Sequence, residues 1–397
     1  MPILSFKKLF RFSKIEKLYS YLAIPFYINL SILFYILRIK IINIIWVNAI
    51  GHLCLETECF LREKYLNKKI NYKCLLLLPD NILANKHIIK YFKKYFYTVT
   101  NKFLCFFLSP LKNISFINHN ISDYCMNIFS TALQYEILNK TSDLEPFYKL
   151  KKEDEIYGYD KLRKYNIKNN DWFITIHARD PFYRNNGIES IRDSSIETYI
   201  KTIDYITSLG GFVIRMGSNK TKPLFIKNTK FIDYAHSEIR SDRMDVFLCA
   251  KAKIFIGTNS GLNNLPLIFN TPILYLNLAP LTQLNSQPGS IGVPKILKYK
   301  NSKKLLKFHE ILANSIGSSF YNNTFEKAGV EFIDNDSDLI LETTIEAIDR
   351  IDKRFIESDE DKILQNKFNK LIVPGHYCYG TGGLISTVFL RKYKFLL

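Results

Sequence analysis

Short apolar runs alternate with longer amphipathic segments through much of the second half of the chain. The pattern predicts strands at residues 172–176, 212–214, 231–232, 254–256 and 272–276, and helices at 194–209, 244–250 and 262–269. The first helix is the best marked, because Ser194 and Glu197 have the spacing of a capping box and Gly210 follows its last apolar residue. Strands and helices that alternate at this spacing indicate a parallel sheet covered on both faces.

The first half of the chain shows the same alternation. It predicts strands at 41–47, 74–78 and 104–108, a turn at 51–53, and helices at 55–65 and 88–97. Residues 145–170 are rich in polar residues and have little helical periodicity, so we expect the connection between the halves there. The expected fold class is therefore α/β, with two Rossmann-like domains facing a cleft, at 41–155 and 156–397.

Residues 1–40 have a different composition. Up to Leu18, basic and apolar residues interleave in a pattern typical of segments that bind an anionic membrane surface. The stretch from Leu18 to Leu37 has no charged residue and the length of a membrane span, although Pro25 interrupts it. Three alternatives stay open: an interfacial membrane anchor, a true span, and helices packed on the first domain. We expect a cytoplasmic protein, peripheral on the inner face of the cytoplasmic membrane.

Composition narrows the class of protein further. The chain has 397 residues, of which 47% are hydrophobic and 23% charged, which is enough apolar material for two packed cores and excludes a disordered chain. A formal net charge of +18 favours polyanionic partners, namely nucleic acid, anionic lipid or phosphorylated substrates. Seven scattered cysteines without a Cys-x-x-Cys pair argue against a disulfide scaffold or structural zinc.

Polar, cationic and glycine residues follow three predicted strands of the second half. The three strings are His177-Ala178-Arg179-Asp180, Ile214-Arg215-Met216-Gly217 and Gly257-Thr258-Asn259-Ser260-Gly261. In parallel α/β sheets, ligands bind outside the carboxyl ends of the strands, so we expect these strings to form one site.

Cations at this edge would suit a phosphorylated ligand. A fixed guanidinium aimed at a β-phosphate can stabilise a nucleoside diphosphate leaving group without a metal, and Arg179 is the candidate. Arg215 could supply a second contact or orient Asp180. A structural alternative is an ion pair between Arg179 and Asp180 that caps the sheet, and His177 could be a buried histidine that shapes its turn.

The turn at 257–261 opens a predicted helix. Its backbone amides, with the hydroxyls of Thr258 and Ser260, could cradle a phosphate, although such residues suit any turn of this kind. Asp245 could accept hydrogen bonds from a base or ribose, or could simply favour the first turn of its helix.

The candidate general base lies in the first half. His52 follows Gly51 after the first predicted strand, where a neutral imidazole could take the proton from an attacking hydroxyl. Asp180 is the competing candidate. The structural alternative for His52 is a residue at a helix N-terminus that bonds to the backbone.

Together these strings resemble known glycosyltransferases. The segment from Ser241 to Gly261, which includes Asp245, resembles the nucleotide-sugar motif of the fucosyltransferase-like superfamily, and His177-x-Arg179 resembles its phosphate-binding His-x-Arg. With residues 50–53, the strings also resemble a bacterial family of predicted glycosyltransferases associated with surface-polysaccharide genes.

The resemblance implies a hexosyl- or deoxyhexosyltransferase of the two-Rossmann (GT-B) type, with a nucleotide-sugar donor and a lipid-linked, lipopolysaccharide or capsule acceptor. The residues implied to bind substrate are Gly51, His177, Arg215, Gly217, Asp245, Thr258, Asn259, Ser260 and Gly261. The implied catalytic residues are Arg179, Asp180 and His52. No cofactor is expected beyond the donor, which is a substrate.

Two strings resemble the manganese-binding Asp-x-Asp of single-Rossmann glycosyltransferases, but we expect no metal. Asp334-x-Asp336 precedes a helical run at 339–351, where acids cap, and Asp359-x-Asp361 lies in a charged stretch expected to be solvated. The functional alternative is a membrane-docked protein that binds nucleotide sugars or glycans without turnover. Nucleic-acid binding ranks last, because no basic helix or aromatic-basic sheet face marks such a surface.

Overall fold

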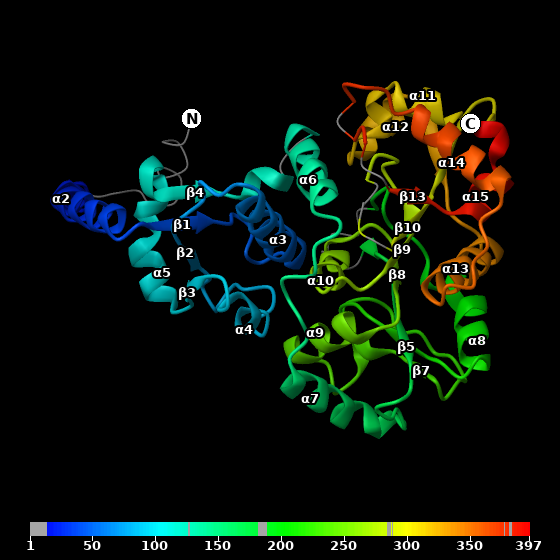
Figure 1. Ribbon diagram of the computed structural model, residues 1–397, viewed down its shortest axis with the longest axis horizontal. Helices are drawn as coiled ribbons and strands as arrows, with labels where there is room; N and C mark the ends of the chain where they lie inside the picture. Colours follow the sequence, from blue (N-terminus) through cyan, green and yellow to red (C-terminus); the bar gives the residue numbers. More distant parts are fainter. Residues whose placement is uncertain are drawn as a thin grey trace.

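The computed structural model describes residues 14–397 apart from 126–127, 182–188, 284–286, 288, 377 and 381–382. The chain folds into two α/β units, each built on its own parallel sheet (Figure 1). The expected α/β fold class with two parallel sheets is confirmed. Most of the basic stretch before Leu18 lies outside the described residues.

The first unit contains a four-stranded parallel sheet in the order β3-β2-β1-β4. Its elements are α2 (Lys14–Ile36), β1 (Ile39–Asn43), α3 (Ile50–Leu66), β2 (Lys73–Leu77), α4 (Ile89–Phe92), β3 (Tyr97–Val99), α5 (Lys102–Leu108), β4 (Asn118–Asn120) and α6 (Ile128–Lys140). Because side chains alternate along a strand, each face of the sheet has its own core. Ile42 and Leu76 pack in the core that includes α3, whereas Ile41 and Leu75 pack with residues of α2 and α5.

Three expectations for this unit are wrong. Residues 104–108 belong to the helix α5, whose start is capped by Asn101, since its side-chain oxygen accepts hydrogen bonds from two backbone amides. Residues 51–53 lie in the first turn of α3, not in a separate turn. Neither β3, at 97–99, nor β4, at 118–120, is among the predicted strands. Apolar runs of four to eight residues suit a helix or a strand equally, which explains the error at α5.

The helix α2 packs along the first unit and contains Pro25. Tyr27, Leu30 and Phe34 face the core shared with α5. No helix in the described part of the chain is both long and apolar enough to cross a membrane. The membrane association expected for this segment stays a prediction.

The second unit contains a seven-stranded parallel sheet in the order β13-β10-β9-β8-β5-β6-β7. The strands are β5 (Phe173–His177), β6 (Phe212–Arg215), β7 (Phe231–Ile232), β8 (Phe255–Gly257), β9 (Ile273–Leu278), β10 (Ile291–Pro294) and β13 (Leu384–Ile385). The helices α8 (Ile200–Ser208), α9 (Asp242–Lys251) and α10 (Asn264–Ile268) connect them. The five predicted strands and three predicted helices of this half are confirmed.

The capping box expected at Ser194 does not form. A 3-10 turn at Ile196–Tyr199 precedes α8, and Ser195 stands at its N-terminus without a side-chain cap. The Ser195 hydroxyl instead bonds the carboxylate of Glu197. The residue at the N-cap is therefore Ser195, which precedes Glu197 by two residues and not by the three that a capping box needs.

A further helix, α7 (Lys152–Leu162), lies inside the stretch expected to connect the two halves with little helix. It packs on α9, because Gly158 allows the backbone to approach Phe247, whose ring atoms lie 2.2 Å from where a Cβ on residue 158 would be. The ring of Tyr159 also stacks edge-on against Phe247 at 5.3 Å.

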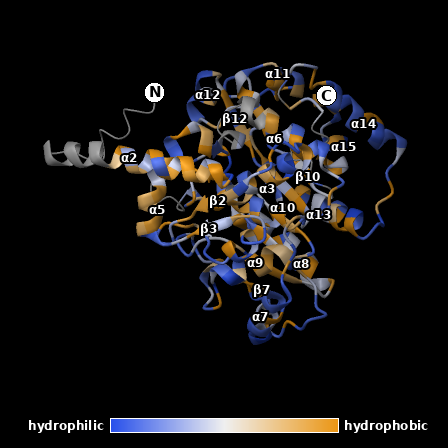
Figure 2. Cartoon of the chain, turned by 60° about the vertical axis from the view of Figure 1, so that its left-hand side comes forward, coloured by the Kyte–Doolittle hydropathy of each residue, from blue (hydrophilic) through white to orange (hydrophobic). Residues whose placement is uncertain are grey.

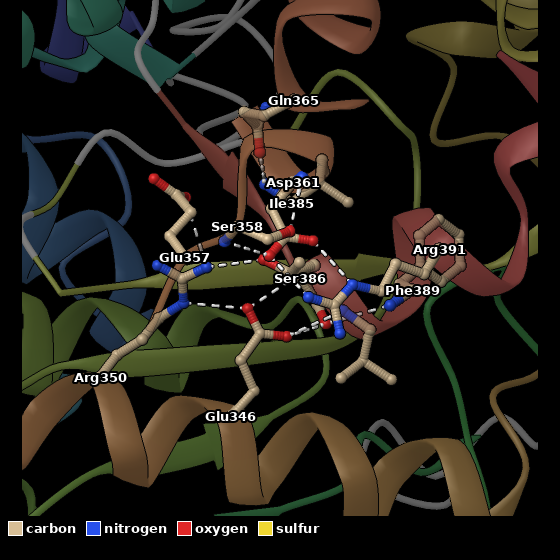
Figure 3. Close-up of polar contacts among 12 residues, drawn as sticks. Glu346, Arg350, Glu357, Ser358, Asp361, Gln365, Ile385, Ser386, Phe389 and Arg391 are labelled. Atoms are coloured by element: carbon tan, nitrogen blue, oxygen red, sulfur yellow. Dashed lines mark hydrogen bonds and ion pairs between the residues drawn. The ribbon is translucent and has the colours of Figure 1, made fainter. Parts of the chain in front are cut away.

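The last part of the chain covers the second unit. It consists of the antiparallel pair β11 (Ile296–Tyr299) and β12 (Val330–Ile333) and the helices α11 (Phe308–Leu312), α12 (Asn322–Lys327), α13 (Ser337–Ile351), α14 (Asp359–Lys370) and α15 (Thr387–Lys392). Asp336 caps α13 as expected. Asp361 was expected to be solvated, but its carboxylate is buried and accepts two hydrogen bonds from Arg391 (Figure 3).

Candidate functional site

The carboxyl edges of the two sheets meet at a glycine contact. A Cβ on Gly51, in the first turn of α3 after β1, would lie 2.6 Å from the Cα of Gly261, in the turn after β8. Asn264 Nδ2 donates a hydrogen bond of 3.1 Å to the carbonyl of Gly51 across the same junction. The close approach of the two backbones therefore requires a glycine at 51, whereas a Cβ on Gly261 would lie 3.3 Å from the Gly51 backbone, a tight contact.

A second contact joins the loop after β2 to the start of α9. Asn85 Nδ2 donates to the carbonyl of Asp242 at 2.9 Å, and the backbone amide of Lys86 donates to the Asp242 carboxylate at 2.6 Å. The residues that follow β1 and β2 thus lie against the residues that follow β7 and β8. Of the three strings singled out in the sequence, the one after β8 lies at this junction.

His177 ends β5 and is a neutral histidine. Burial lowers its pKa to about 4; the hydrogen bond to the Met216 carbonyl opposes this shift, and the charges of Arg215 and Arg179 add to it. Gly257 lies beside it, where a Cβ would come within 2.8 Å of the His177 carbonyl oxygen. The close pairing of β5 and β8 therefore accounts for a glycine at 257.

Gly217 has a φ of +149°, a backbone conformation that favours glycine, and lies next to His177 after β6. Its position in the second string reflects the turn after β6. Gly217 therefore accounts for the backbone turn and supplies no side chain that could bind a ligand.

Arg179 binds a different carboxylate from the one expected. Its guanidinium pairs with Asp193, and its backbone amide donates to the Thr258 hydroxyl at 2.8 Å. The Asp193 carboxylate also accepts from the Ser190 amide at 2.7 Å, and Lys295 Nζ donates to the Asp193 carbonyl at 2.7 Å. A diphosphate at Arg179 would therefore have to share this guanidinium with Asp193.

Burial raises the pKa of Asp193, and the Ser190 amide and the cations of Arg179 and Lys295 oppose that shift. Sequence reasoning missed Asp193, which lies 14 residues after its arginine in a segment with no regular pattern. Their contact is a feature of the tertiary structure that local sequence patterns do not show.

Arg215 ends β6 and is almost fully buried. Its guanidinium forms an ion pair of 3.0 Å with Asp233 and donates to the carbonyl of Lys222 at 2.8 Å. A longer hydrogen bond of 3.3 Å reaches the Thr221 hydroxyl. These contacts, none of them to Asp180, hold the loop after β6 in place.

The side chains of the turn after β8 support the turn itself. Asn263 Nδ2 donates to the carbonyl of Thr258 at 2.9 Å, and the Ser260 hydroxyl donates to Asn263 Oδ1 at 3.2 Å. Asn259 Nδ2 reaches the carbonyl of Ala279, after β9, at 3.4 Å. The turn is thus held rigidly next to Gly51.

Asp245 lies in the first turn of α9 and accepts a hydrogen bond of 2.7 Å from the Tyr234 hydroxyl. Burial raises its pKa to about 6; the Tyr234 hydrogen bond and Arg240 lower it, and Asp242 raises it. The carboxylate is engaged within the second unit, so a contact with a base or ribose would have to compete with Tyr234.

His52 has the partners of a general base. Its Nδ1 lies 2.7 Å from Oε1 of Glu56, one helical turn later in α3, and the Glu56 side chain is fully buried. The ring also contacts that of Trp46, with centroids 4.6 Å apart. A carboxylate at Nδ1 holds the proton on that nitrogen and leaves Nε2 as the proton acceptor. The His52 side chain is 30% exposed, which allows an acceptor to reach it.

A cavity of about 610 Å³ opens at the carboxyl ends of β5, β6 and β10. Its lining includes Asp180 and Asp193 from the loop after β5, Arg215 at the end of β6, and Lys295 after β10. Phe332 of β12 contributes apolar surface. This volume lies in the range of small-molecule pockets, and the mixture of charged and aromatic side chains suits a polar ligand with a ring.

Within the described ranges, no three His, Cys, Asp or Glu side chains are grouped so that they could hold a metal ion.

The sequence matches no protein-family model and no curated protein. In overall structure the chain is similar to a glycosyl transferase family 9 protein from Veillonella parvula, at 9% sequence identity and a TM-score of 0.49, over 78% of this chain and 97% of that one. It is also similar to TibC, an iron-containing dodecameric glycosyltransferase from enterotoxigenic E. coli, at 12% identity and a TM-score of 0.36, over 61% and 60% of the two chains. At this level of similarity, function has to be inferred from the side chains of the site.

Proposed function

We propose that the protein is a glycosyltransferase that moves a sugar from a nucleotide-activated donor to a hydroxyl of a lipid-linked or surface-polysaccharide acceptor. The observation that carries this proposal is the contact between Gly51 and Gly261. It sets α3, with His52 and Glu56, against the strand-end turn of the second unit. A base on one unit then faces a phosphate-binding edge on the other, which is the arrangement that sugar transfer between two bound substrates needs.

The donor would lie along the second unit. Its nucleoside would occupy the cavity of about 610 Å³, and its diphosphate would lie at Arg179, whose partner Asp193 lines that cavity. The backbone of Arg179 is bonded to Thr258, in the turn that reaches Gly51 through Gly261. This continuous path leads from the cavity to His52.

The reaction follows from these positions. The oxygen of the acceptor hydroxyl forms a bond to the anomeric carbon while the bond from that carbon to the β-phosphate oxygen breaks, and the hydroxyl proton passes to Nε2 of His52. Glu56 holds the Nδ1 proton and stabilises the imidazolium that forms. The leaving nucleoside diphosphate keeps the electron pair, and the guanidinium of Arg179 stabilises its growing charge.

The test is sugar transfer by an Arg179→Ala variant, after nucleoside diphosphates and their sugar conjugates have been screened by thermal shift on the parent to identify the donor. We expect turnover to fall about 100- to 1,000-fold, the cost of removing one fixed donor to a developing anion. Unchanged transfer by a folded Arg179→Ala protein would refute the proposed role of this residue.

Asp193→Asn is the matched variant, because it keeps Arg179 and removes the charge that competes with a diphosphate. We expect it to bind the nucleoside diphosphate more tightly than the parent. Binding of a nucleotide sugar by the parent without transfer to any acceptor would instead favour the alternative of a binding protein without turnover.

A further inference from the structure

The outer side of α2 is apolar although its inner side already fills a core. Tyr27, Leu30 and Phe34 recur at helical spacing and face the sheet. On the opposite side, Ile28 is 50% exposed and Ile36 is 69% exposed. A helix that is apolar on all sides is normally buried on all sides, so we expect another molecule to bury the outer side of α2.

The neighbouring helix α5 extends this surface. Cys105 and Leu108 turn to the core, whereas Phe103 is 72% exposed and Phe106 is 71% exposed. The ring of Phe107 lies against that of Phe26 of α2, with centroids 5.5 Å apart. Figure 2 shows apolar residues over both helices at the edge of the first unit.

We call the exposed apolar residues of these two helices the α2–α5 surface; they include Phe26, Ile32, Ile36, Phe103, Phe106 and Phe107. Single exposed apolar residues are common in proteins, but a continuous patch over two helices marks a docking site.

Charge indicates what docks there. The sequence has no acidic residue from Leu18 to Leu55 and none from Asn81 to Ser122, which are the two segments that contain α2 and α5. The second of these segments contains six lysines: Lys86, Lys90, Lys93, Lys94, Lys102 and Lys112. Lys102 begins α5, and its ammonium lies 4.9 Å from the ring centre of Phe103, at the edge of the patch. Apolar and aromatic side chains edged by cations and free of acids match the interface of an anionic bilayer.

We propose that the α2–α5 surface docks on an anionic phospholipid bilayer, with the phenyl rings of α5 inserted beside α2. This goes beyond the membrane association expected for residues 1–40, because it adds the helix α5, which the sequence predicted to be a strand. The surface lies on the face of the four-stranded sheet opposite α3, which packs in the other core. Docking therefore leaves His52 and the junction with the second unit uncovered, and the proposal does not depend on sugar transfer.

The test is co-sedimentation of the full chain with vesicles of phosphatidylcholine alone or of phosphatidylcholine mixed with phosphatidylglycerol. We expect binding to the mixed vesicles and much weaker binding to the neutral ones. A Phe103→Ser/Phe106→Ser double variant should lose about tenfold or more of the affinity for mixed vesicles, because each phenyl ring contributes by burial in lipid. Lys102→Glu should weaken binding about fivefold and make the remaining binding less sensitive to salt, because one cationic contact with the anionic lipid is removed.

The matched control is Phe225→Ser, since Phe225 is 91% exposed on the second unit. It should bind vesicles like the parent, and both phenylalanine variants should keep the parent's melting temperature. The basic residues before Lys14 are unchanged in all variants, so the difference measures α5 alone. Equal binding by the double variant and the parent would overturn the proposal, as would a parent that binds neither vesicle. A parent dimer that the double variant breaks, without vesicle binding, would assign the surface to a second copy of the chain.

Discussion

At the scale of single residues, the strand-end side chains of the second unit mostly hold one another. Arg215 is committed to Asp233, and Asp245 to Tyr234. Arg179 pairs with Asp193, which in turn lines the cavity. The sequence allowed an ion pair between Arg179 and its neighbour Asp180. In the structure, Arg179 pairs instead with Asp193, 14 residues later. Such pairing fixes the geometry of a site before a ligand arrives.

The acid sensitivity of the protein should depend on His177. Its pKa is lowered to about 4 by burial, against an ordinary value near 6.5, so the folded form stays neutral while the unfolded chain takes up a proton as the pH falls. The stability that this histidine contributes is present above pH ~6.5 and is lost as the pH falls towards 4. We expect a loss of about 2 kcal/mol in the free energy of unfolding between pH 7 and 5.

Urea unfolding at these two pH values would measure this loss. His177→Asn cannot take up the proton and should lose about 2 kcal/mol less than the parent over the same interval. An equal loss in the variant would mean that another group causes the acid sensitivity.

His52 and Glu56 should differ in how they affect turnover. His52→Ala removes the base and should lower kcat about 100- to 10,000-fold. Glu56→Gln keeps a partner at Nδ1 but removes the charge that stabilises the imidazolium, so we expect a smaller fall in kcat and a shift of the pH-rate profile. The readout is kcat against pH with saturating donor. Loss of folding without a shift of the profile would make Glu56 merely structural.

At the scale of elements, the last helix is held by carboxylates on the two helices before it. Glu346 of α13 accepts a hydrogen bond of 2.5 Å from the Ser386 hydroxyl and one of 3.0 Å from the backbone amide of Thr387 (Figure 3). Arg350 Nε donates to the same carboxylate at 2.9 Å. On α14, Asp361 plays the corresponding part for Arg391.

Glu346→Ala should lower the free energy of unfolding by about 3 kcal/mol, because it leaves the Arg350 charge and several buried donors without their acceptor. Glu342→Ala, on an exposed position of the same helix, is the control and should change stability by less than about 0.5 kcal/mol. Urea unfolding of both variants measures the two changes in the free energy of unfolding. Similar small effects would show that α15 is held by its apolar contacts alone.

The elements of the second unit could be predicted well, and those of the first less well. The strands at 172–176 and 254–256 are short apolar runs with polar residues on either side, and this pattern is enough to identify them. The run at 103–108 is short and apolar throughout, so periodicity does not distinguish helix from strand. Asn101 was the available signal, because an asparagine before such a run favours a helix start.

At the scale of the whole molecule, the two units touch where their catalytic and donor-binding residues would have to cooperate. Gly51→Ala places a methyl group 2.6 Å from the Cα of Gly261, a distance that backbone atoms cannot accept without moving. The donor path lies within the second unit, so donor binding by thermal shift should stay close to that of the parent. Transfer should fall about tenfold or more, because His52 moves with α3.

Donor binding and sugar transfer are both measured on the same Gly51→Ala protein. The comparison distinguishes a local effect at the contact between the units from a change in the fold of the second unit. Transfer at the parent's rate would show that the contact between the units is not needed for activity. Loss of donor binding together with transfer would mean that the change reaches the second unit.

The sequence by itself determined the alternation of strands and helices and the clustering of polar residues at strand ends, because both depend on residues close together in the chain. It also made His52 a candidate base, although the contact of His52 with Glu56 is visible only in the structure, where both lie in α3. The tertiary structure alone decided that Arg179 pairs with Asp193, that Gly51 meets Gly261, and that α5 exposes its phenyl rings. These depend on sheet order and loop paths that join residues far apart in the sequence, and local periodicity carries no information about them.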